Sequence, residues 1–141
     1  TWLKHLNVEE CVLIVYSSSV RTFPADGSVA DVRGSAGKSK RDELMRQLQT
    51  VKPGGWTNTL DALRKAYEYD VDTVLLFTDG APSRASSGAY DERIAQQIYA
   101  LSREHANVPI NTIGLGNYFD ENMATFLRTV ASLTGGTFRG E

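Results

Sequence analysis

The sequence predicts an α/β fold, namely a doubly wound and mostly parallel sheet with helices on both faces. Three observations support this class. Apolar runs typical of buried strands alternate with segments in which apolar residues recur every three or four positions. Turns rich in glycine, proline and serine separate the two kinds of segment. Strands that alternate with helices in this way form parallel sheets through right-handed crossovers.

The first expected element is a strand at residues 11–16, where β-branched and apolar side chains follow one another. The strand-like pattern continues through three serines towards residues 20–23. A turn is predicted at residues 24–27 because Pro-Ala-Asp-Gly favours chain reversal. We expect residues 29–37 to form a short irregular excursion that ends in a flexible, glycine-containing loop.

Two helices are expected next. Ser39 lies three residues before Asp42, which is a capping pattern, and apolar residues then follow at helical spacing as far as residue 51. Asn58 and Asp61 repeat the capping pattern and predict the start of a second helix.

The second half of the chain begins with the strongest strand signal. Four large apolar residues at 74–77 suit a central parallel strand that is buried on both faces, and the run ends at Asp79, which a glycine follows. The later expected elements are an exposed loop at 81–89, a helix from Asp91, a strand at 108–116, a helix from Asp120 and a short final strand at 137–139.

Composition limits the function classes. The chain has 141 residues, of which 41% are hydrophobic, and we expect residues 1–141 to form a single domain. The formal net charge is −2 with both signs mixed along the sequence, so nucleic acid is not expected as a partner. Membrane insertion is not expected either, because no apolar run is long enough. Cys11 is the single cysteine and is expected to pack.

Two polar segments are candidate ligands for a cation. Asp79 directly follows a strand, and ligands of parallel sheets bind beyond the carboxyl ends of the strands. Residues 54–59 precede a helix and can bring the Thr57 hydroxyl to the same edge. These hard oxygens suit Mg²⁺, Mn²⁺ or Ca²⁺ better than zinc. The alternative interpretations are that Asp79 only forms a turn and that Thr57 only caps the helix.

Other candidate residues carry weaker signals. His5 and His105 are isolated, so surface or capping roles are favoured over metal binding. Trp56 could contact a partner beside the site, but packing of the loop is the favoured role. Tyr118 and Phe119 are candidates for a partner-facing edge or for the core.

Four sequence motifs occur together in this chain. Their combination is a more specific family signal than any one motif alone. They are Phe77-Thr78-Asp79-Gly80-Ala81-Pro82, Gly54-Gly55-Trp56-Thr57-Asn58-Thr59-Leu60-Asp61-Ala62-Leu63, Ile113-Gly114-Leu115-Gly116 and Leu133-Thr134-Gly135-Gly136-Thr137-Phe138. Together they resemble von Willebrand factor type A domains, and the resemblance runs from about residue 9 to the end. It implies a Rossmann-like fold and a protein-binding role.

In that family a metal-ion-dependent adhesion site is built from three loops. They carry Asp-x-Ser-x-Ser after the first strand, a threonine in a glycine-rich loop and an aspartate in a Thr-Asp-Gly turn. Thr57 and Asp79 match the second and third motifs. The resemblance therefore implies that both residues are ligands of a divalent cation, Mg²⁺, Mn²⁺ or Ca²⁺.

The first motif of this site has no match. Ser17 and Ser19 have the right spacing, but Val15 occupies the place of the acid, and residues 26–30 have Ala30 in place of the second serine. By the register of the resemblance, residues 17–19 follow the family's second strand and are structural or loop-forming.

The register also implies that the family's first strand is missing from this chain. Residues 2–6 correspond to the end of the family's first helix. Loss of a central strand exposes backbone donors and acceptors, so strand exchange or oligomerisation through the unpaired sheet edge is expected. We expect the cation to bind weakly, because the affinity for hard cations falls with ligand number and charge.

The leading functional hypothesis is a protein-binding module in which an acidic side chain of the partner completes the cation site. The alternative is a degenerate, metal-free domain with a structural or accessory role in a larger assembly. A Mg²⁺-dependent hydrolase that uses Asp79 is disfavoured, because Ala81 occupies the place of the second acid and no Gly-x-x-x-x-Gly-Lys is present. We therefore expect no enzymatic activity.

Overall fold

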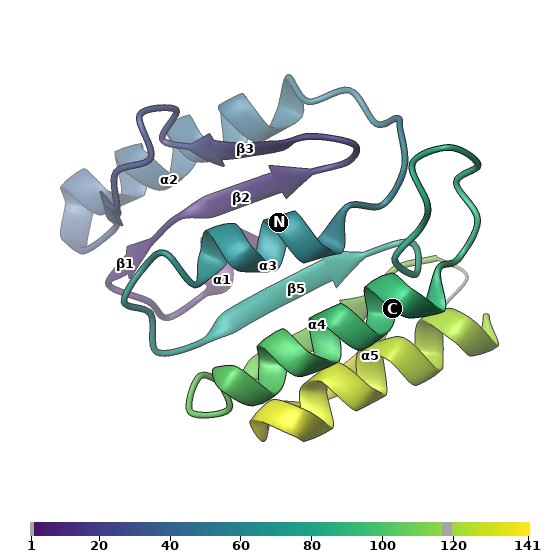
Figure 1. The fold of residues 1–141 in the computed structure, drawn as a ribbon. Coiled ribbons are helices and arrows are strands. Elements are labelled where there is room, and N and C mark those ends of the chain that lie inside the picture. The colour runs from purple at the N-terminus through teal and green to yellow at the C-terminus, as the bar shows by residue number, and fades with distance from the viewer. Residues whose placement is uncertain (1, 117–119) are drawn as a thin grey trace.

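The computed structural model describes residues 2–116 and 120–141, so Tyr118 and Phe119 lie outside the described residues. The elements in chain order are α1 (Trp2–His5), β1 (Glu10–Cys11), β2 (Leu13–Tyr16), β3 (Val20–Phe23), β4 (Ala30–Asp31), α2 (Gly34–Gln49), α3 (Thr59–Ala66), β5 (Val74–Thr78), α4 (Glu92–Glu104), β6 (Ile110–Gly114), α5 (Glu121–Thr134) and β7 (Phe138–Gly140). Figure 1 shows their arrangement.

Strand pairing divides the described strands into separate groups. β5, β6 and β7 form a parallel sheet in that order, with Val74 opposite Ile110. β2 and β3 form an antiparallel hairpin, and β1 and β4 are also paired in antiparallel orientation. The α/β class and the parallel strands are therefore confirmed. The strand pattern at 11–23 is a hairpin that turns at Ser17–Ser19, because the Ser17 N–H donates to the Ser19 carbonyl at 3.0 Å.

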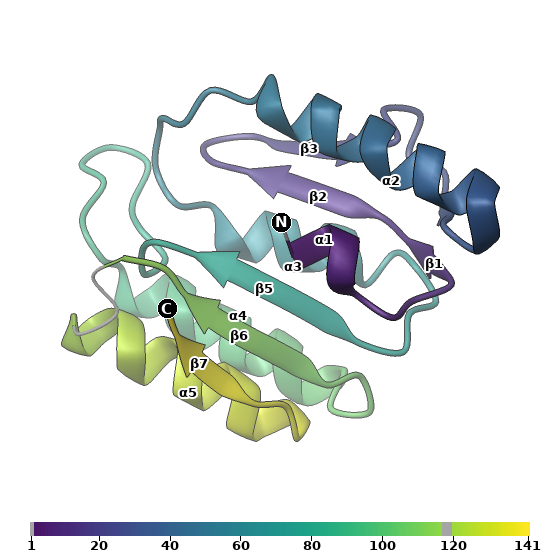
Figure 2. The same ribbon diagram turned by 180° about the vertical axis from the view of Figure 1, so that it is seen from behind.

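Helices lie on both faces of the strands, as the sequence predicts. In Figure 1, α3, α4 and α5 lie in front of the strands, and in Figure 2, the view from behind, α1 and α2 lie in front. Among residues 2–116 and 120–141, no helix combines the length and the apolar character that a membrane crossing needs.

Two apolar cores match these two layers. The larger core lies between the β5–β6 strands and helices α3, α4 and α5, and Ile98, Ile110 and Phe126 are completely buried in it. The smaller core joins α1, α2 and β4 through Leu3 and Leu44. The larger core therefore supports β5, the strand that Asp79 directly follows.

The start of α2 differs from the sequence prediction. Residues 34–37 form the first turn of the helix and are not a flexible loop, and Arg33, not Ser39, occupies the N-cap position. Gly37 explains the difference, because a β-carbon at this position would lie 2.0 Å from the Val32 carbonyl carbon. The helix can therefore begin early, since glycine permits close packing on the preceding strand.

The other helix boundaries follow the predicted signals. Asn58 caps α3 by accepting a hydrogen bond from the Asp61 N–H at 3.4 Å, and Asp120 caps α5 by accepting one from the Met123 N–H at 2.9 Å. Gly135 ends α5 with a φ of 71°, a left-handed conformation that favours glycine.

One side chain, Arg41 of α2, holds the amino-terminal segment in place. Its guanidinium donates to the carbonyl oxygens of Leu3 at 2.7 Å, Leu6 at 2.8 Å and Val8 at 2.9 Å. Its Nε also donates to the Val32 carbonyl at 3.4 Å. The rigid fork of arginine donors suits this arrangement, which satisfies carbonyls at the end of α1 that the helix leaves unpaired.

The loop between β5 and α4 is exposed over residues 84–89, as predicted, but Pro82 and Ser83 are buried and the loop is closed by hydrogen bonds. The Arg84 Nε donates to the Asp91 carboxylate at 2.9 Å, and the same carboxylate accepts from the Arg93 N–H at 2.9 Å and caps α4. Arg84, followed by these helix amides, lowers the pKa of Asp91 below its ordinary value. Asp91 thus joins the loop to the start of the helix.

Replacing Arg41 by Lys should lower the free energy of unfolding by about 1–3 kcal/mol, because lysine keeps the charge but loses the donor fork. Urea denaturation measures this change, and amide exchange should rise in residues 3–8. Arg46→Lys is the matched control, since Arg46 is exposed and its Nε bonds only to a carbonyl of its own helix. Equal losses in the two variants would contradict this role for Arg41.

Replacing Asp91 by Asn should destabilise the domain in a pH-dependent way. Because the folded pKa of Asp91 is lowered, its carboxylate stabilises the fold fully above its unfolded pKa of about 4 and loses this effect as the pH falls through the folded pKa. The stability difference between wild type and variant should therefore be constant at neutral pH and shrink below about pH 4. Thermal unfolding at a series of pH values measures it, with the exposed Asp72→Asn as control.

Candidate functional site

Three loops meet at the carboxyl ends of β2 and β5. The Asn58 N–H donates to the Ser17 carbonyl at 3.0 Å, which joins the loop before α3 to the turn of the β2–β3 hairpin. Gly55 lies against Ser18, because a β-carbon at Gly55 would be 2.8 Å from the Ser18 Oγ. The φ of Gly55 is +92°, so glycine alone fits this contact without strain. Ser17 and Ser18 thus take part in loop packing.

Thr57 is fixed by the third loop. Its N–H donates to the Ser83 Oγ at 2.8 Å, and the Ser83 N–H donates to the Thr57 carbonyl at 3.2 Å. The Thr57 hydroxyl lies next to Gly80, since a β-carbon there would be 3.2 Å from it. The structure therefore brings Thr57 beside the residue that follows Asp79. Because Asn58 caps α3, the capping interpretation of Thr57 is wrong.

Asp79 lies on the exposed side of a turn that is held from inside. The buried Thr78 Oγ donates to the Gly80 carbonyl at 2.9 Å and accepts from the Gly80 N–H at 3.3 Å. β5 ends at Thr78, and the next residue, Asp79, is exposed. The Asp79 carboxylate and the Thr57 hydroxyl therefore belong to one rim, which we define as residues 17–19, 54–58 and 79–83.

Two buried hydroxyls lie beneath this rim. Among the described residues, the Tyr16 Oη and the Thr59 Oγ are buried and form no hydrogen bond. Burial raises the pKa of the Tyr16 phenol, and the charge of Asp79 acts in the same direction, while nearby Thr78 and Thr59 hydroxyls oppose it. The sequence analysis overlooked both residues, although a tyrosine that ends an apolar strand is a usable signal.

The rim offers the oxygen ligands that hard cations prefer. These are the Asp79 carboxylate and the Thr57 hydroxyl. Within residues 2–116 and 120–141, no cluster of three or more His, Cys, Asp or Glu residues could hold a metal. The residues present fit a magnesium-type ion in ligand chemistry, but they supply a single carboxylate.

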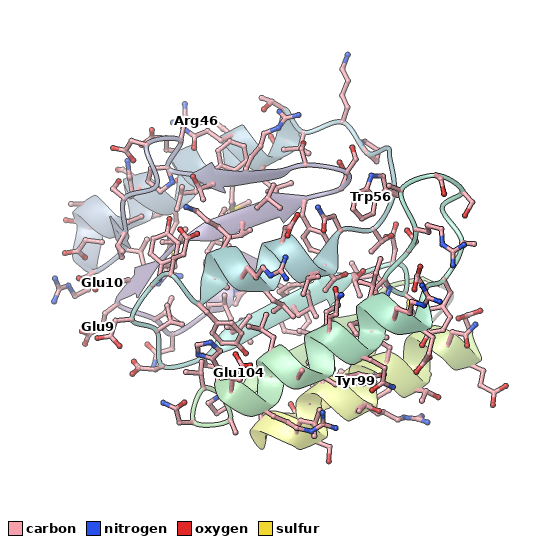
Figure 3. The ribbon with its side chains drawn as sticks, in the orientation of Figure 1. Glu9, Glu10, Arg46, Trp56, Tyr99 and Glu104 are labelled. Atoms are coloured by element: carbon pink, nitrogen blue, oxygen red, sulfur yellow. The ribbon has the colours of Figure 1, made fainter. Side chains whose placement is uncertain are left out.

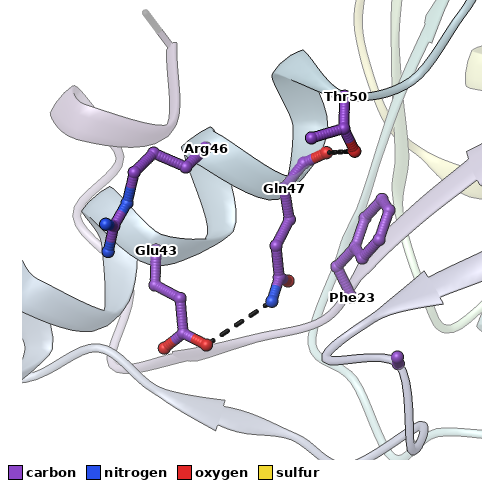
Figure 4. A pocket seen from close by; sticks show the side chains of 6 residues that line it. Phe23, Glu43, Arg46, Gln47 and Thr50 are labelled. Atoms are coloured by element: carbon purple, nitrogen blue, oxygen red, sulfur yellow. Dashed lines mark hydrogen bonds between the residues drawn. The ribbon is translucent and has the colours of Figure 1, made fainter.

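Two surface hollows lie on either side of β3. One has a volume of about 520 Å³ and lies between β3 and α2 (Figure 4), and the other, of about 690 Å³, lies between β3 and α3. Neither is lined by Thr57 or Asp79. In Figure 4 the side chain of Gln47 lies between Glu43 and Phe23 and donates to the Glu43 carboxylate. These hollows are therefore separate from the rim.

The remaining candidate residues have structural surroundings. His105 stacks on Tyr67 at a centroid distance of 4.0 Å, His5 is exposed, and Cys11 is half-buried beside the smaller core. Burial raises the pKa of the Cys11 thiol. Trp56 is half-buried, and Figure 3 shows it on the loop that leads into α3. Cys11 therefore packs, as expected.

Comparison with known proteins identifies the family. A family model described as von Willebrand factor type A domain matches residues 12–139. Human von Willebrand factor A domain-containing protein 3B is 32% identical over 127 residues, which are 87% of this chain and 9% of that protein. The human protein 3A is 35% identical over 97 residues, which are 68% of this chain and 8% of that protein.

The chain thus spans less than a tenth of the length of these two relatives. No solved structure matches it. The family match covers nearly the whole chain and agrees with its α/β architecture. The chain belongs to the family of von Willebrand factor type A domains.

Proposed function

We propose that this domain is a protein-binding module and that its rim, residues 17–19, 54–58 and 79–83, contacts the partner. Domains of this family generally mediate protein interactions. The observation that carries the proposal is the pair of hydrogen bonds between Thr57 and Ser83, which brings the Thr57 hydroxyl beside the Asp79 turn. The three loops are held to one another by hydrogen bonds, and residues 18–19, 54–55 and 79 are exposed for contact with a partner.

We further propose that Thr57 and Asp79 hold a divalent cation, Mg²⁺, Mn²⁺ or Ca²⁺, at this rim. When bound, the cation would join the rim to an acidic side chain of the partner protein. The Thr57 hydroxyl and the Asp79 carboxylate supply oxygen atoms, which are the ligands that hard cations prefer. Binding should be weak because the site has a single carboxylate and affinity for hard cations rises with the charge of the ligands.

We also propose that β2 and β5 belong to one doubly wound sheet in which a further strand would lie between them. Figures 1 and 2 show the two strands pointing in the same direction. β2 and β5 are not hydrogen-bonded to each other, because β2 pairs with β3 and β5 pairs with β6. Their facing edges therefore have unpaired backbone groups, which favour strand exchange or oligomerisation.

A metal-free structural or accessory domain of a larger assembly is the second candidate. It is favoured by one observation, the lack of a cluster of three acidic or other ligating side chains in the described part of the chain. In this case the rim would bind its partner through shape and hydrogen bonds alone. Both candidates are binding functions, and we propose no catalytic activity for either.

Replacing Asp79 by Asn should abolish most cation binding, because it removes the charge while keeping the shape of the side chain. We expect wild-type dissociation constants for Mn²⁺ of about 0.1–1 mM, and at least a tenfold loss in Asp79→Asn. Isothermal titration calorimetry measures both values. Asp70→Asn, at an exposed position after α3, is the matched control.

Circular dichroism should show that Asp79→Asn keeps the fold, since residue 79 is exposed and the turn is held by Thr78. Micromolar Mn²⁺ binding by the wild type would contradict weak binding. Equal affinity in the wild type and Asp79→Asn would contradict a ligand role for Asp79. A wild type that binds no Mn²⁺ would favour the metal-free candidate.

A further inference from the structure

Tyr16 and Thr59 have hydroxyl groups that the fold buries without using. Tyr16 ends β2 and Thr59 begins α3, and neither hydroxyl has a hydrogen-bond partner in the described part of the chain. Thr59 is completely buried, with 0% of its surface exposed. A buried hydroxyl without a partner lowers stability, so a phenylalanine and a valine of similar shape would pack at less cost.

The position of these two hydroxyls connects them with the rim. The hydroxyls of Thr59 and Thr78 lie near enough to the Tyr16 Oη to lower the pKa of its phenol, and the charge of Asp79 raises it. No hydrogen bond of good geometry satisfies the Tyr16 Oη or the Thr59 Oγ in the described part of the chain. The Thr78 hydroxyl is already engaged with both backbone groups of Gly80. The Tyr16 and Thr59 hydroxyls therefore lie near one another and near Asp79, each without a hydrogen bond of good geometry.

Among the described residues, a third buried hydroxyl without a partner, that of Tyr67, lies away from the rim. Tyr67 also has an unpartnered hydroxyl, but this residue follows the last turn of α3 and stacks on His105 at the end of α4. Since Thr59 begins α3 and Tyr67 follows its end, the two hydroxyls lie at opposite ends of the helix. Tyr67 therefore provides an internal comparison for any role that depends on closeness to Asp79.

We propose that Tyr16 and Thr59 are positioning residues of the Thr57–Asp79 site, and that their two hydroxyls hold one hydrogen-bond-accepting oxygen beneath the Asp79 turn. This inference rests on the proposed function of the rim. A water molecule and a carboxylate of an acidic segment present the same acceptor chemistry. Either oxygen would accept hydrogen bonds from the two hydroxyls and also belong to the cation site. Removal of one hydroxyl should therefore weaken cation binding, although neither hydroxyl contacts the cation.

Three variants test the inference, each removing one hydroxyl at nearly constant shape: Tyr16→Phe, Thr59→Val and the control Tyr67→Phe. The first readout is Mn²⁺ affinity by calorimetry, and the second is the midpoint of thermal unfolding without metal. We expect Tyr16→Phe and Thr59→Val to lose about tenfold or more in affinity, as is usual for residues that support metal ligands. Their unfolding midpoints should be equal to that of the wild type or higher, and Tyr67→Phe should keep the wild-type affinity.

Two arms identify the source of the oxygen. A loss of affinity with Mn²⁺ alone assigns a water molecule, and a loss that emerges only with saturating acetate assigns a carboxylate. Wild-type affinity in both variants and both arms would overturn the inference while leaving the proposed function intact. A wild type that binds no Mn²⁺ in either arm would overturn the inference together with the cation site, and it would favour the metal-free candidate. Failure of both variants to fold would also overturn the inference, because it would assign the hydroxyls to the fold.

Discussion

The reciprocal hydrogen bonds between Thr57 and Ser83 are the constraint on which the rim depends. They join the loop before α3 to the loop after β5, which are separated in the chain by a helix and a strand. Ser83 is 4% exposed, so these bonds are protected from competition with water. Without them neither the Thr57 hydroxyl nor the loop that Asp91 closes would have a fixed place relative to Asp79.

The two ends of the molecule differ in how their polar groups are satisfied. Arg41 supplies donors to three carbonyl oxygens of the amino-terminal segment and to the Val32 carbonyl. Beneath the rim, Tyr16 and Thr59 keep hydroxyls without partners. Buried polar groups are usually paired, so an unpaired set is more informative about binding than a satisfied one. The unpaired hydroxyls of Tyr16 and Thr59 are therefore a cost in stability that lies close to the rim.

Local signals predicted most of the elements. The apolar run at 74–77, the capping aspartates at 91 and 120 and the left-handed Gly135 act within a few residues of the chain, and the structure has a strand or a helix end at each. The start of α2 could not be predicted in this way. It depends on the contact between Gly37 and Val32, which only a folded strand and helix create.

The sequence by itself determined the α/β class, the strands and helices from residue 74 onwards, and the two segments that carry Thr57 and Asp79, because periodicity and turn chemistry are properties of neighbouring residues. Only the tertiary structure decided that Ser83 holds Thr57, that Asn58 takes over the cap, and that Tyr16 lies beneath Asp79. Two of these contacts join residues more than 20 positions apart, and the third decides which of two adjacent residues caps the helix. Packing of whole elements sets both, and no local pattern encodes them.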